Sequence, residues 1–233
     1  MKHEHVHVHC DDMGQKVKCL SCGSPNEGFF CRDCHTLLPM GKEVDFFSLL
    51  EVERRPSVNL DKLKDVFLRI SGMVHPDKYY SASAEAKEIA MQYSSLLNKA
   101  YSTLKEPKDR LKYLISLETD KETPVSGKAS AETMEFFIET SDVCKEADAL
   151  IKKGSSGDAE KRDLLQRLLD VKKESHIKWI RVLKDIDAID AEWVSTAENE
   201  RRPLVRRLII ISHELSYLSK LQSLVDEMIV GLS

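Results

Sequence analysis

Two long amphipathic helical patterns flank the short stretch GMVHPDKYY at residues 72–80, and together they restrict this part of the chain to a helical hairpin. Apolar residues recur three and four positions apart on both sides, which is the period of a buried helix face. Pro76 cannot continue a helix, and an aspartate such as Asp77 can cap the next one. Two such helices joined by a short loop pack antiparallel. The apolar positions are Leu60, Leu63, Phe67, Ile70 and Val74 before the loop, and Ile89, Tyr93, Leu96, Ala100, Tyr101 and Leu104 after it.

Helical periodicity continues through most of the remaining chain. Helices are predicted over residues 45–50, 107–117, 131–152 and 159–186, and from Pro203 onward. The last three are joined by short connections, which is typical of a helical bundle. We predict a mainly α fold with a cysteine hairpin, a helical hairpin and a three-helix bundle. The residues expected in the core of the last two helices are Leu164, Leu165, Leu168, Leu169, Ile177, Ile180, Leu183 and Ile186, then Leu204, Leu208, Ile211, Leu215, Leu218, Gln222, Val225 and Ile229.

Four cysteines near the amino terminus have the spacing of a metal site. The segment CLSCGSPNEGFFCRDC contains two C-x2-C pairs, Cys19 with Cys22 and Cys31 with Cys34, separated by eight residues. Each pair can form a tight turn that directs two thiolates at one point, so the two turns supply a tetrahedral zinc site. Four protein ligands leave no open position, which indicates one structural zinc. Two disulfides or an iron atom in a four-thiolate site are the alternatives, and the lack of a recognisable secretory signal disfavours the disulfides.

Composition excludes several classes of protein. The chain is 42% hydrophobic and 32% charged, which is typical of a globular protein. The net charge is −4, so general electrostatic binding to nucleic acid is not expected. The amino-terminal residues 1–16 are acidic and poor in Arg and Ser, and so make a poor mitochondrial presequence. Their alternating histidines predict a solvated tail, with weak metal binding as the alternative.

The order of these elements resembles a J-domain, and more narrowly the HscB-type (Jac-type) co-chaperones of iron–sulfur cluster biogenesis. The resemblance rests on DFFSLLEV, HPDK, NKAYSTLKEP and YLISL, followed by AETMEFFIE at the start of an acidic helical segment. The cysteine pairs are similar to those of the animal members. The resemblance implies a tail over 1–16, a zinc module over 17–42, a J-domain over 43–117, a linker over 118–130 and a client-binding bundle over 131–233.

The same resemblance implies roles for the loop. In the family, the HPD loop docks on a DnaK-class chaperone of the seventy-kilodalton heat-shock family and promotes ATP hydrolysis there. Asp77 would pair with an arginine of that chaperone, a charge-assisted contact. The other implied chaperone-binding residues are His75, Pro76, Lys78, Lys62, Lys64 and Arg69. The residues just before the loop, Gly72 to Val74, depart from the basic pattern that is usual there, so a weaker or more partner-specific electrostatic contact is expected.

A client surface follows from the resemblance as well. Residues matching Phe137, Ile138, Asp142 and Tyr217 contact an IscU-like iron–sulfur scaffold protein in the family. Phe136 and Phe137 point about 100° apart on a helix, so they cannot both centre on one core. The alternative is that Phe137 and Ile138 are ordinary core residues. Ser141 and Lys145 depart from the family's apolar and acidic types, which predicts a different affinity or partner surface.

The predicted function is that of a co-chaperone without enzymatic activity of its own. No nucleophile, phosphate-binding loop or catalytic metal cluster accompanies the HPD sequence. A J-protein with a different client and a zinc-ribbon module for nucleic acid are the competing hypotheses. Family resemblance suggests a mitochondrion or a derived organelle, with the cytoplasm as the alternative. No membrane partner is expected, because no apolar run approaches the roughly 20 residues needed to span a bilayer. The oligomeric state does not follow from the sequence.

Overall fold

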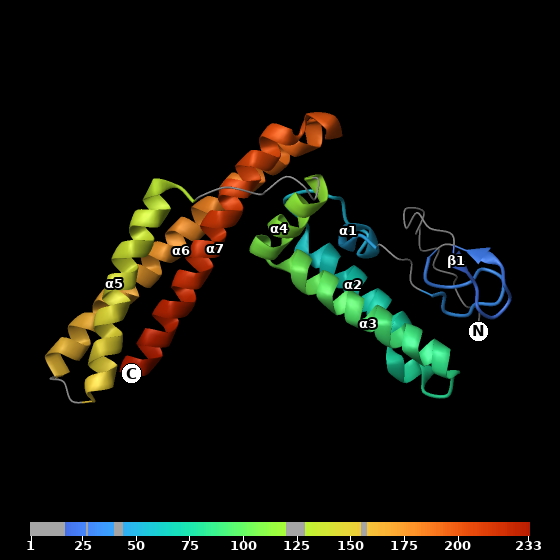
Figure 1. Ribbon diagram of the computed structural model, residues 1–233, viewed down its shortest axis with the longest axis horizontal. Helices are drawn as coiled ribbons and strands as arrows, with labels where there is room; N and C mark the ends of the chain where they lie inside the picture. Colours follow the sequence, from blue (N-terminus) through green and yellow to red (C-terminus); the bar gives the residue numbers. More distant parts are fainter. Residues whose placement is uncertain (1–16, 27, 40–43, 120–128, 155–157) are drawn as a thin grey trace. The chain divides into compact units, whose positions relative to one another are not determined.

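The computed structural model describes residues 17–26, 28–39, 44–119, 129–154 and 158–233 (Figure 1). These residues divide into two compact units. The first contains the chain up to Arg54 and Val58–Glu106, and the second contains Arg55–Ser57 and Pro107–Ser233. The segment 107–117 therefore packs with the bundle, although the resemblance assigns it to the J-domain. The proposed functional boundaries, including the tail over 1–16, which lies outside the described residues, stay predictions.

The described chain is mainly α, as the sequence predicts. Its only strands, within the described part, form one short antiparallel pair in which Val17 lies opposite Asn26. The elements are β1 (Val17–Lys18), β2 (Pro25–Asn26), α1 (Phe46–Leu49), α2 (Leu60–Val74), the 3-10 helix η1 (Pro76–Tyr79), α3 (Ala84–Lys105), α4 (Pro107–Glu118), α5 (Ala131–Lys153), α6 (Asp158–Ser195), the 3-10 helix η2 (Glu198–Glu200) and α7 (Arg202–Leu232).

Helices α2 and α3 form the predicted hairpin of the first unit, with α1 packed on α3 (Figure 1). The side chain of Asn59 caps α2 by accepting a hydrogen bond from Lys62 N at 2.9 Å, and Ser83 caps α3 in the same way. Apolar residues of both helices fill the space between them, and the rings of Phe67 and Tyr101 stack at 4.3 Å. The hairpin thus fixes both ends of the loop that carries the HPD sequence.

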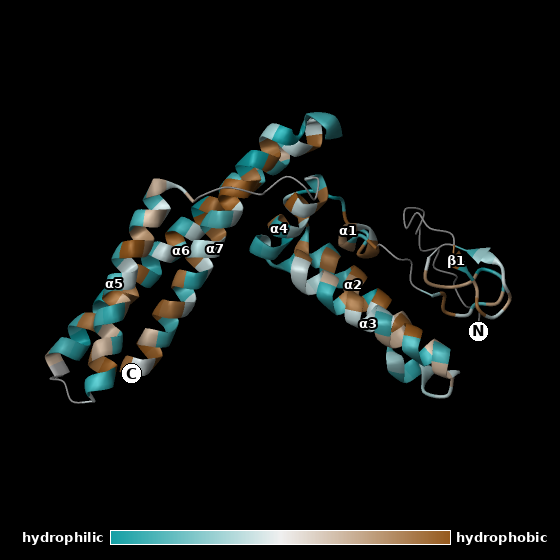
Figure 2. Ribbon diagram, viewed as in Figure 1, coloured by the Kyte–Doolittle hydropathy of each residue, from teal (hydrophilic) through white to brown (hydrophobic). Residues whose placement is uncertain are grey.

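Helices α5, α6 and α7 form the bundle of the second unit, and α4 packs against α7. Figure 2 shows apolar residues in bands along these helices. Helix α6 continues to Ser195, beyond the predicted end near residue 186, because Ile189 and Trp193 extend its buried face.

Part of the predicted buried face of α6 is wrong. Leu169, Ile177 and Ile180, which were expected in the core, are 44%, 52% and 41% exposed. Leu168 and Ile186 are buried and lie about five full turns apart on the helix, so they point in the same direction. Ile177 lies midway between them and therefore points to the opposite side. On α7, Leu221 and Met228 are buried, whereas Gln222, which was predicted to be the polar member of the core, is half-buried.

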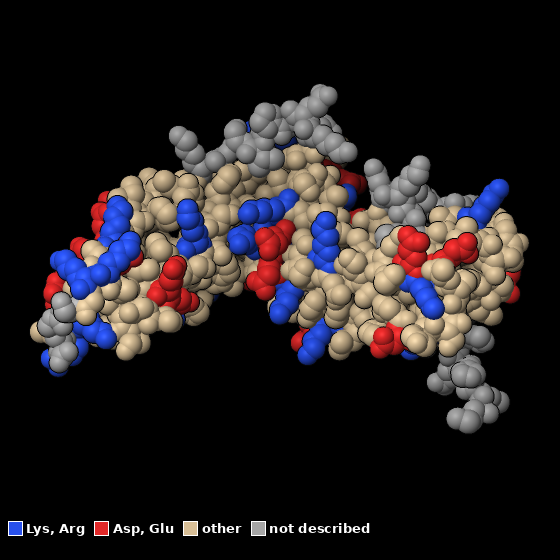
Figure 3. All heavy atoms as spheres, turned by 60° about the horizontal axis from the view of Figure 1, so that its bottom comes forward, with Lys and Arg blue, Asp and Glu red and all other residues tan. Residues whose placement is uncertain are grey.

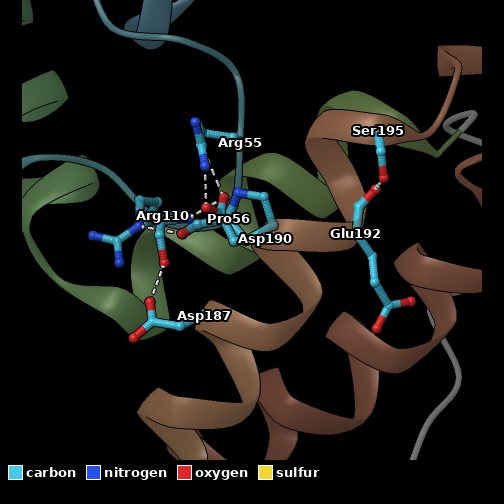
Figure 4. A network of polar contacts seen from close by, with 8 residues as sticks. Arg55, Pro56, Arg110, Asp187, Asp190, Glu192 and Ser195 are labelled. Atoms are coloured by element: carbon cyan, nitrogen blue, oxygen red, sulfur yellow. Dashed lines mark hydrogen bonds and ion pairs between the residues drawn. The ribbon is translucent and has the colours of Figure 1, made fainter.

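A polar network in the second unit holds the segment 55–57 and α4 in place (Figure 4). The carboxylate of Asp190 accepts hydrogen bonds from the Arg55 guanidinium and, at 3.0 Å, from the backbone N–H of Ser57. Arg110, itself buried, donates from Nε to the carbonyl of Pro56 at 2.8 Å. Because each buried charge has a partner, the network avoids the cost of desolvating an unpaired ion.

Surface charge is mixed on the face that Figure 3 shows, where basic and acidic side chains are interspersed among other residues. That face carries no broad basic surface of the kind that nucleic-acid binding requires. Among the described residues, no helix has the length and apolar character needed to cross a membrane.

Candidate functional site

The HPD sequence forms a tight, exposed turn between α2 and α3. Helix α2 ends at Val74, and Pro76 opens η1, where its missing N–H costs no hydrogen bond. The N–H of Lys78 donates to the carbonyl of His75 at 3.0 Å and closes the turn. The Asp77 carboxylate is 89% exposed. The turn therefore presents a carboxylate to solvent on a rigid backbone.

His75 supports this turn from within. Its Nδ1 accepts a hydrogen bond from the backbone N–H of Asp77 at 3.3 Å, which requires that this nitrogen carry no proton. The same nitrogen lies 3.5 Å from Asp77 Oδ2, an ion pair only if the ring is protonated. Through the amide contact the imidazole caps the first turn of η1. His75 thus positions the turn while its other nitrogen remains available as a donor.

The predicted basic residues of α2 do not form one patch. Lys62 and Lys64 are exposed, but two residues along a helix correspond to about 200°, so they point to different sides. Arg69 lies two turns from Lys62 on the same side and is paired with Glu51 at 2.6 Å. Lys78 is exposed within η1. Of the predicted basic residues, Lys78 is thus the nearest in the chain to Asp77.

The four cysteines come together as the spacing predicts. Their sulfur atoms all lie within 4.8 Å of one another, with 3.4 Å between Cys19 and Cys34 and 3.5 Å between Cys22 and Cys31. Four sulfurs bound to one zinc ion lie roughly 3.8 Å apart at the corners of a tetrahedron. The arrangement is therefore close to a zinc site, and the thiols form no disulfide.

Two similar turns build the cysteine site. Gly23 N–H donates to the carbonyl of Cys19, and His35 N–H donates to the carbonyl of Cys31, each at 2.9 Å. Gly23 and His35 both have positive φ, so each turn closes in the left-handed region. His35 thus serves the backbone of the turn, and within the described part of the chain the cluster that could hold a metal ion consists of the four cysteines.

Hydrogen bonds and burial divide the four thiols into two kinds. Cys19 and Cys31 are buried, and Cys22 and Cys34 are exposed. Burial raises the pKa of the Cys31 thiol to about 11, whereas a hydrogen bond with the Thr36 hydroxyl lowers the pKa of Cys34 to about 6. Asn26, which the sequence analysis missed, is buried and donates from Nδ2 to Cys31 Sγ at 3.3 Å. An amide donor stabilises a buried thiolate, so Asn26 supports the charged form of Cys31 that a metal requires.

The candidate client residues lie on neighbouring helices. The rings of Phe137 on α5 and Tyr217 on α7 meet edge to face at 5.2 Å, and both are half-buried. Lys220 Nζ lies 5.9 Å from the centre of the Phe137 ring. Ile138, the next residue of α5, is 58% exposed, while Phe136 is buried. The structure thus places two aromatic rings and an isoleucine at the edge of the bundle.

The fourth predicted client residue has a partner of its own. Asp142 is exposed and paired with Lys145 at 2.8 Å. An exposed pair of this kind is worth little energy and exchanges readily with solvent. Asp142 therefore remains available to a basic group of a partner, at the cost of releasing Lys145.

In the order of the chain, a four-cysteine site, a helical hairpin with an exposed HPD turn and a helical bundle follow one another, which is the order that the resemblance to HscB-type co-chaperones predicts. This chain is similar to proteins named HscB. It is 34% identical to the mouse iron–sulfur cluster co-chaperone protein HscB over 106 residues, and 33% identical to the human protein of that name over 105 residues. The crystal structure of human co-chaperone protein HscB aligns with a TM-score of 0.61 at 21% identity, covering 90% of this chain and 97% of that one.

These comparisons confirm the resemblance to HscB-type co-chaperones and the mainly α fold. The sequence alignments cover 43% of this chain, and the chain spans less than half the length, 45%, of the curated relatives it matches. No family model matches the chain. The structural likeness, at 21% identity, supports the fold alone, so the activity and the partners are treated below as proposals.

Proposed function

We propose that this chain is a J-domain co-chaperone of iron–sulfur cluster biogenesis. It stimulates the ATPase of a DnaK-class chaperone through the HPD turn and delivers an IscU-like scaffold protein bound to its helical bundle. The two activities use different units of the chain, which lets one protein bring client and chaperone together. The similarity to proteins named iron–sulfur cluster co-chaperone HscB supports an iron–sulfur scaffold protein as the client, rather than a different client protein.

The exposed turn is the observation that carries the proposal. Asp77 is held by a closed backbone turn, yet its carboxylate does little for the fold, because it is almost entirely in solvent. A rigid, exposed carboxylate is suited to a charge-assisted contact with a cation of a partner. In this proposal the HPD loop binds the chaperone and does not itself convert a substrate.

The first experiment measures ATP hydrolysis by a DnaK-class chaperone with increasing amounts of this protein. Asp77→Asn should abolish stimulation while leaving helicity and melting temperature unchanged. Asp163→Asn, an exposed aspartate of α6, is the matched control and should stimulate like the unmodified chain. Normal stimulation by the Asp77 variant would rule out the proposed activity.

The client surface is proposed to be the cluster of Phe137, Ile138 and Tyr217, with Asp142 at its rim. Apolar anchors that are partly exposed and surrounded by polar groups are typical of binding patches. The combined variant Phe137→Ala, Ile138→Ala, Tyr217→Ala should weaken binding of an IscU-like scaffold by at least about 2 kcal/mol. Stimulation of the chaperone in the absence of client should stay intact.

The control for this variant is its stability. Unchanged melting with lost binding supports a docking surface, whereas collapse of the fold would show that the three residues serve the core. Ile180→Ala removes an exposed apolar side chain from a different helix and should leave scaffold binding unchanged. Retained binding in a folded triple variant would place the client elsewhere.

The cysteine site is proposed to hold one structural zinc, since the sulfur distances and the four-thiolate donor set fit that metal. The proposed compartment is a mitochondrion or a derived organelle, with the cytoplasm as the alternative. Metal analysis of the purified protein tests the first proposal: one zinc per chain and no visible absorption are expected, and a coloured protein would point to iron.

A further inference from the structure

Tyr80 is a large aromatic residue that the structure leaves almost entirely in solvent. It is 83% exposed, although it directly follows the tight turn of η1. Its neighbour Tyr79 accounts for the local packing, because Tyr79 is half-buried and donates from its hydroxyl to the carbonyl of Met73 at 3.4 Å. The fold therefore gives no packing reason for an aromatic ring at position 80.

The geometry of η1 places Tyr80 on the same side as Asp77. In a 3-10 helix, side chains three positions apart eclipse each other. Tyr80 is three positions after Asp77, and its N–H donates to the Asp77 carbonyl at 3.3 Å, so the two residues bracket one 3-10 turn. An exposed carboxylate and an exposed aromatic ring are thereby presented together.

The ring already lies near a cation in this structure. Lys87 Nζ of α3 lies 5.6 Å from the centre of the Tyr80 ring, within the range of a cation–π interaction. Both groups are exposed, so this contact is weak and leaves most of the ring in solvent. The ring therefore stands in a position where a cation can approach its face.

We propose that Asp77 and Tyr80 together bind one guanidinium group of the chaperone, with the carboxylate accepting its hydrogen bonds and the ring stacking on its plane. This inference rests on the proposed function and adds Tyr80 as a residue that determines affinity and selectivity. A guanidinium fits both groups at once, because it is planar, donates in a fork that matches a carboxylate, and stacks on aromatic faces. An ammonium has no such plane, so the pair favours arginine over lysine.

The test compares four single variants in the chaperone ATPase assay, each over a range of concentrations. Tyr80→Phe keeps the ring and should behave like the unmodified chain. Tyr80→Ala and Tyr80→Leu should each raise the concentration for half-maximal stimulation by about 5- to 30-fold, the range of a cation–π contact that becomes partly desolvated. The stimulation reached at saturation should be retained. Met91→Ala, an exposed apolar side chain of α3, is the matched control and should change nothing.

Two results would overturn the role of Tyr80 while the proposed function stands. One is a Tyr80→Ala variant that stimulates like Met91→Ala, and the other is a Tyr80→Leu variant that stimulates like the unmodified chain, which would indicate a simple apolar contact. A different result would contradict the proposed function itself. If the unmodified chain stimulated no ATPase, or if Asp77→Asn stimulated normally, both the J-domain activity and the role of Tyr80 would be wrong.

Discussion

Replacing Asp190 by alanine should destabilise the second unit more than any other single change of an aspartate in it. This carboxylate of α6 is only 8% exposed and accepts hydrogen bonds from both the Arg55 guanidinium and the Ser57 backbone. Removing it leaves the guanidinium of Arg55 without this carboxylate and the N–H of Ser57 without its acceptor. The segment 55–57 then loses its attachment to α6 (Figure 4).

The magnitude follows from how far each group can return to water. Breaking a fully buried ion pair costs about 3–5 kcal/mol, because a charge is left without a partner in a medium of low dielectric. The Arg55 side chain is 30% exposed, so part of its charge is rehydrated after the substitution. Hydrogen bonds to charged groups are each worth about 1.5–3 kcal/mol. We therefore expect the free energy of unfolding of this unit to fall by about 2–3 kcal/mol.

Tryptophan fluorescence reports this loss directly. The two tryptophans of the chain, Trp179 and Trp193, both lie in α6, and Trp193 is almost completely buried. In a Trp179→Phe background, urea unfolding followed through Trp193 monitors the bundle alone. A loss of 2–3 kcal/mol corresponds to a shift of the midpoint by roughly 1 M for a urea dependence near 2 kcal/mol per M.

Asp187 supplies the matched control on the same helix. It is exposed and accepts one hydrogen bond, from the Ser57 hydroxyl at 2.7 Å, so Asp187→Ala should cost no more than about 0.5 kcal/mol. In a double-mutant cycle, Arg55→Ala should add little once Asp190 has been removed. Equal effects of the Asp187 and Asp190 substitutions, or additive effects of Arg55 and Asp190, would refute the reasoning.

Three further predictions concern the cysteine module and the bundle. Cys19→Ser should abolish metal binding and remove amide-exchange protection from residues 17–26 and 28–39, as metal analysis and hydrogen exchange would show; a metal-loaded variant would contradict this. Phe29→Ala should speed amide exchange in the middle of α3 by about fivefold, because Phe29 is buried and the centre of its ring lies 5.2 Å from that of Tyr93. Phe30→Ala, the next residue in the chain, is the control. Equal exchange rates in α3 for the two variants would contradict a stabilising contact between Phe29 and Tyr93. The hydrogen bond and charge of Lys178 lower the pKa of Glu132. This carboxylate therefore stabilises the bundle above its unfolded pKa, and the stabilisation is lost as the pH falls through its folded pKa. In a plot of the urea midpoint against pH, Glu132→Gln should flatten the acid side below about pH 4.5, and an unchanged acid side would exclude this ion pair as the cause of the pH dependence.

Local patterns were enough to predict the helical hairpin and the cysteine site. The hairpin depends on apolar residues three and four positions apart, and its caps, Asn59 and Ser83, stand next to the helices they cap. The cysteine site depends on two identical spacings, each of which closes its own turn. In both cases the residues that make the structure are close in sequence, so their pattern is readable without knowledge of the fold.

Contacts between distant residues could not be predicted in this way. Arg55 and Asp190 lie 135 positions apart, and nothing near either one marks the other as its partner. Phe29 lies between the two cysteine pairs in the sequence, yet its ring contacts Tyr93 of α3. The prediction that Ile177 and Ile180 are buried was wrong for a related reason. Apolar residues at helical spacing indicate which faces of a helix are apolar, but the neighbouring helices decide which of those faces is buried.

Substitutions of Asp77 and Asp190 compare a proposed functional aspartate with a structural one. The first is 89% exposed in a turn that the backbone closes by itself, and the second is 8% exposed and holds two groups of another segment. Loss of the first should therefore leave stability unchanged and remove chaperone stimulation. Loss of the second should weaken the fold, yet any chain that remains folded should still stimulate the chaperone at saturation, because the turn in the first unit is intact. If both variants lost stimulation in proportion to their stability, the HPD turn would have no special role, and the proposal of a J-domain activity would fail with it.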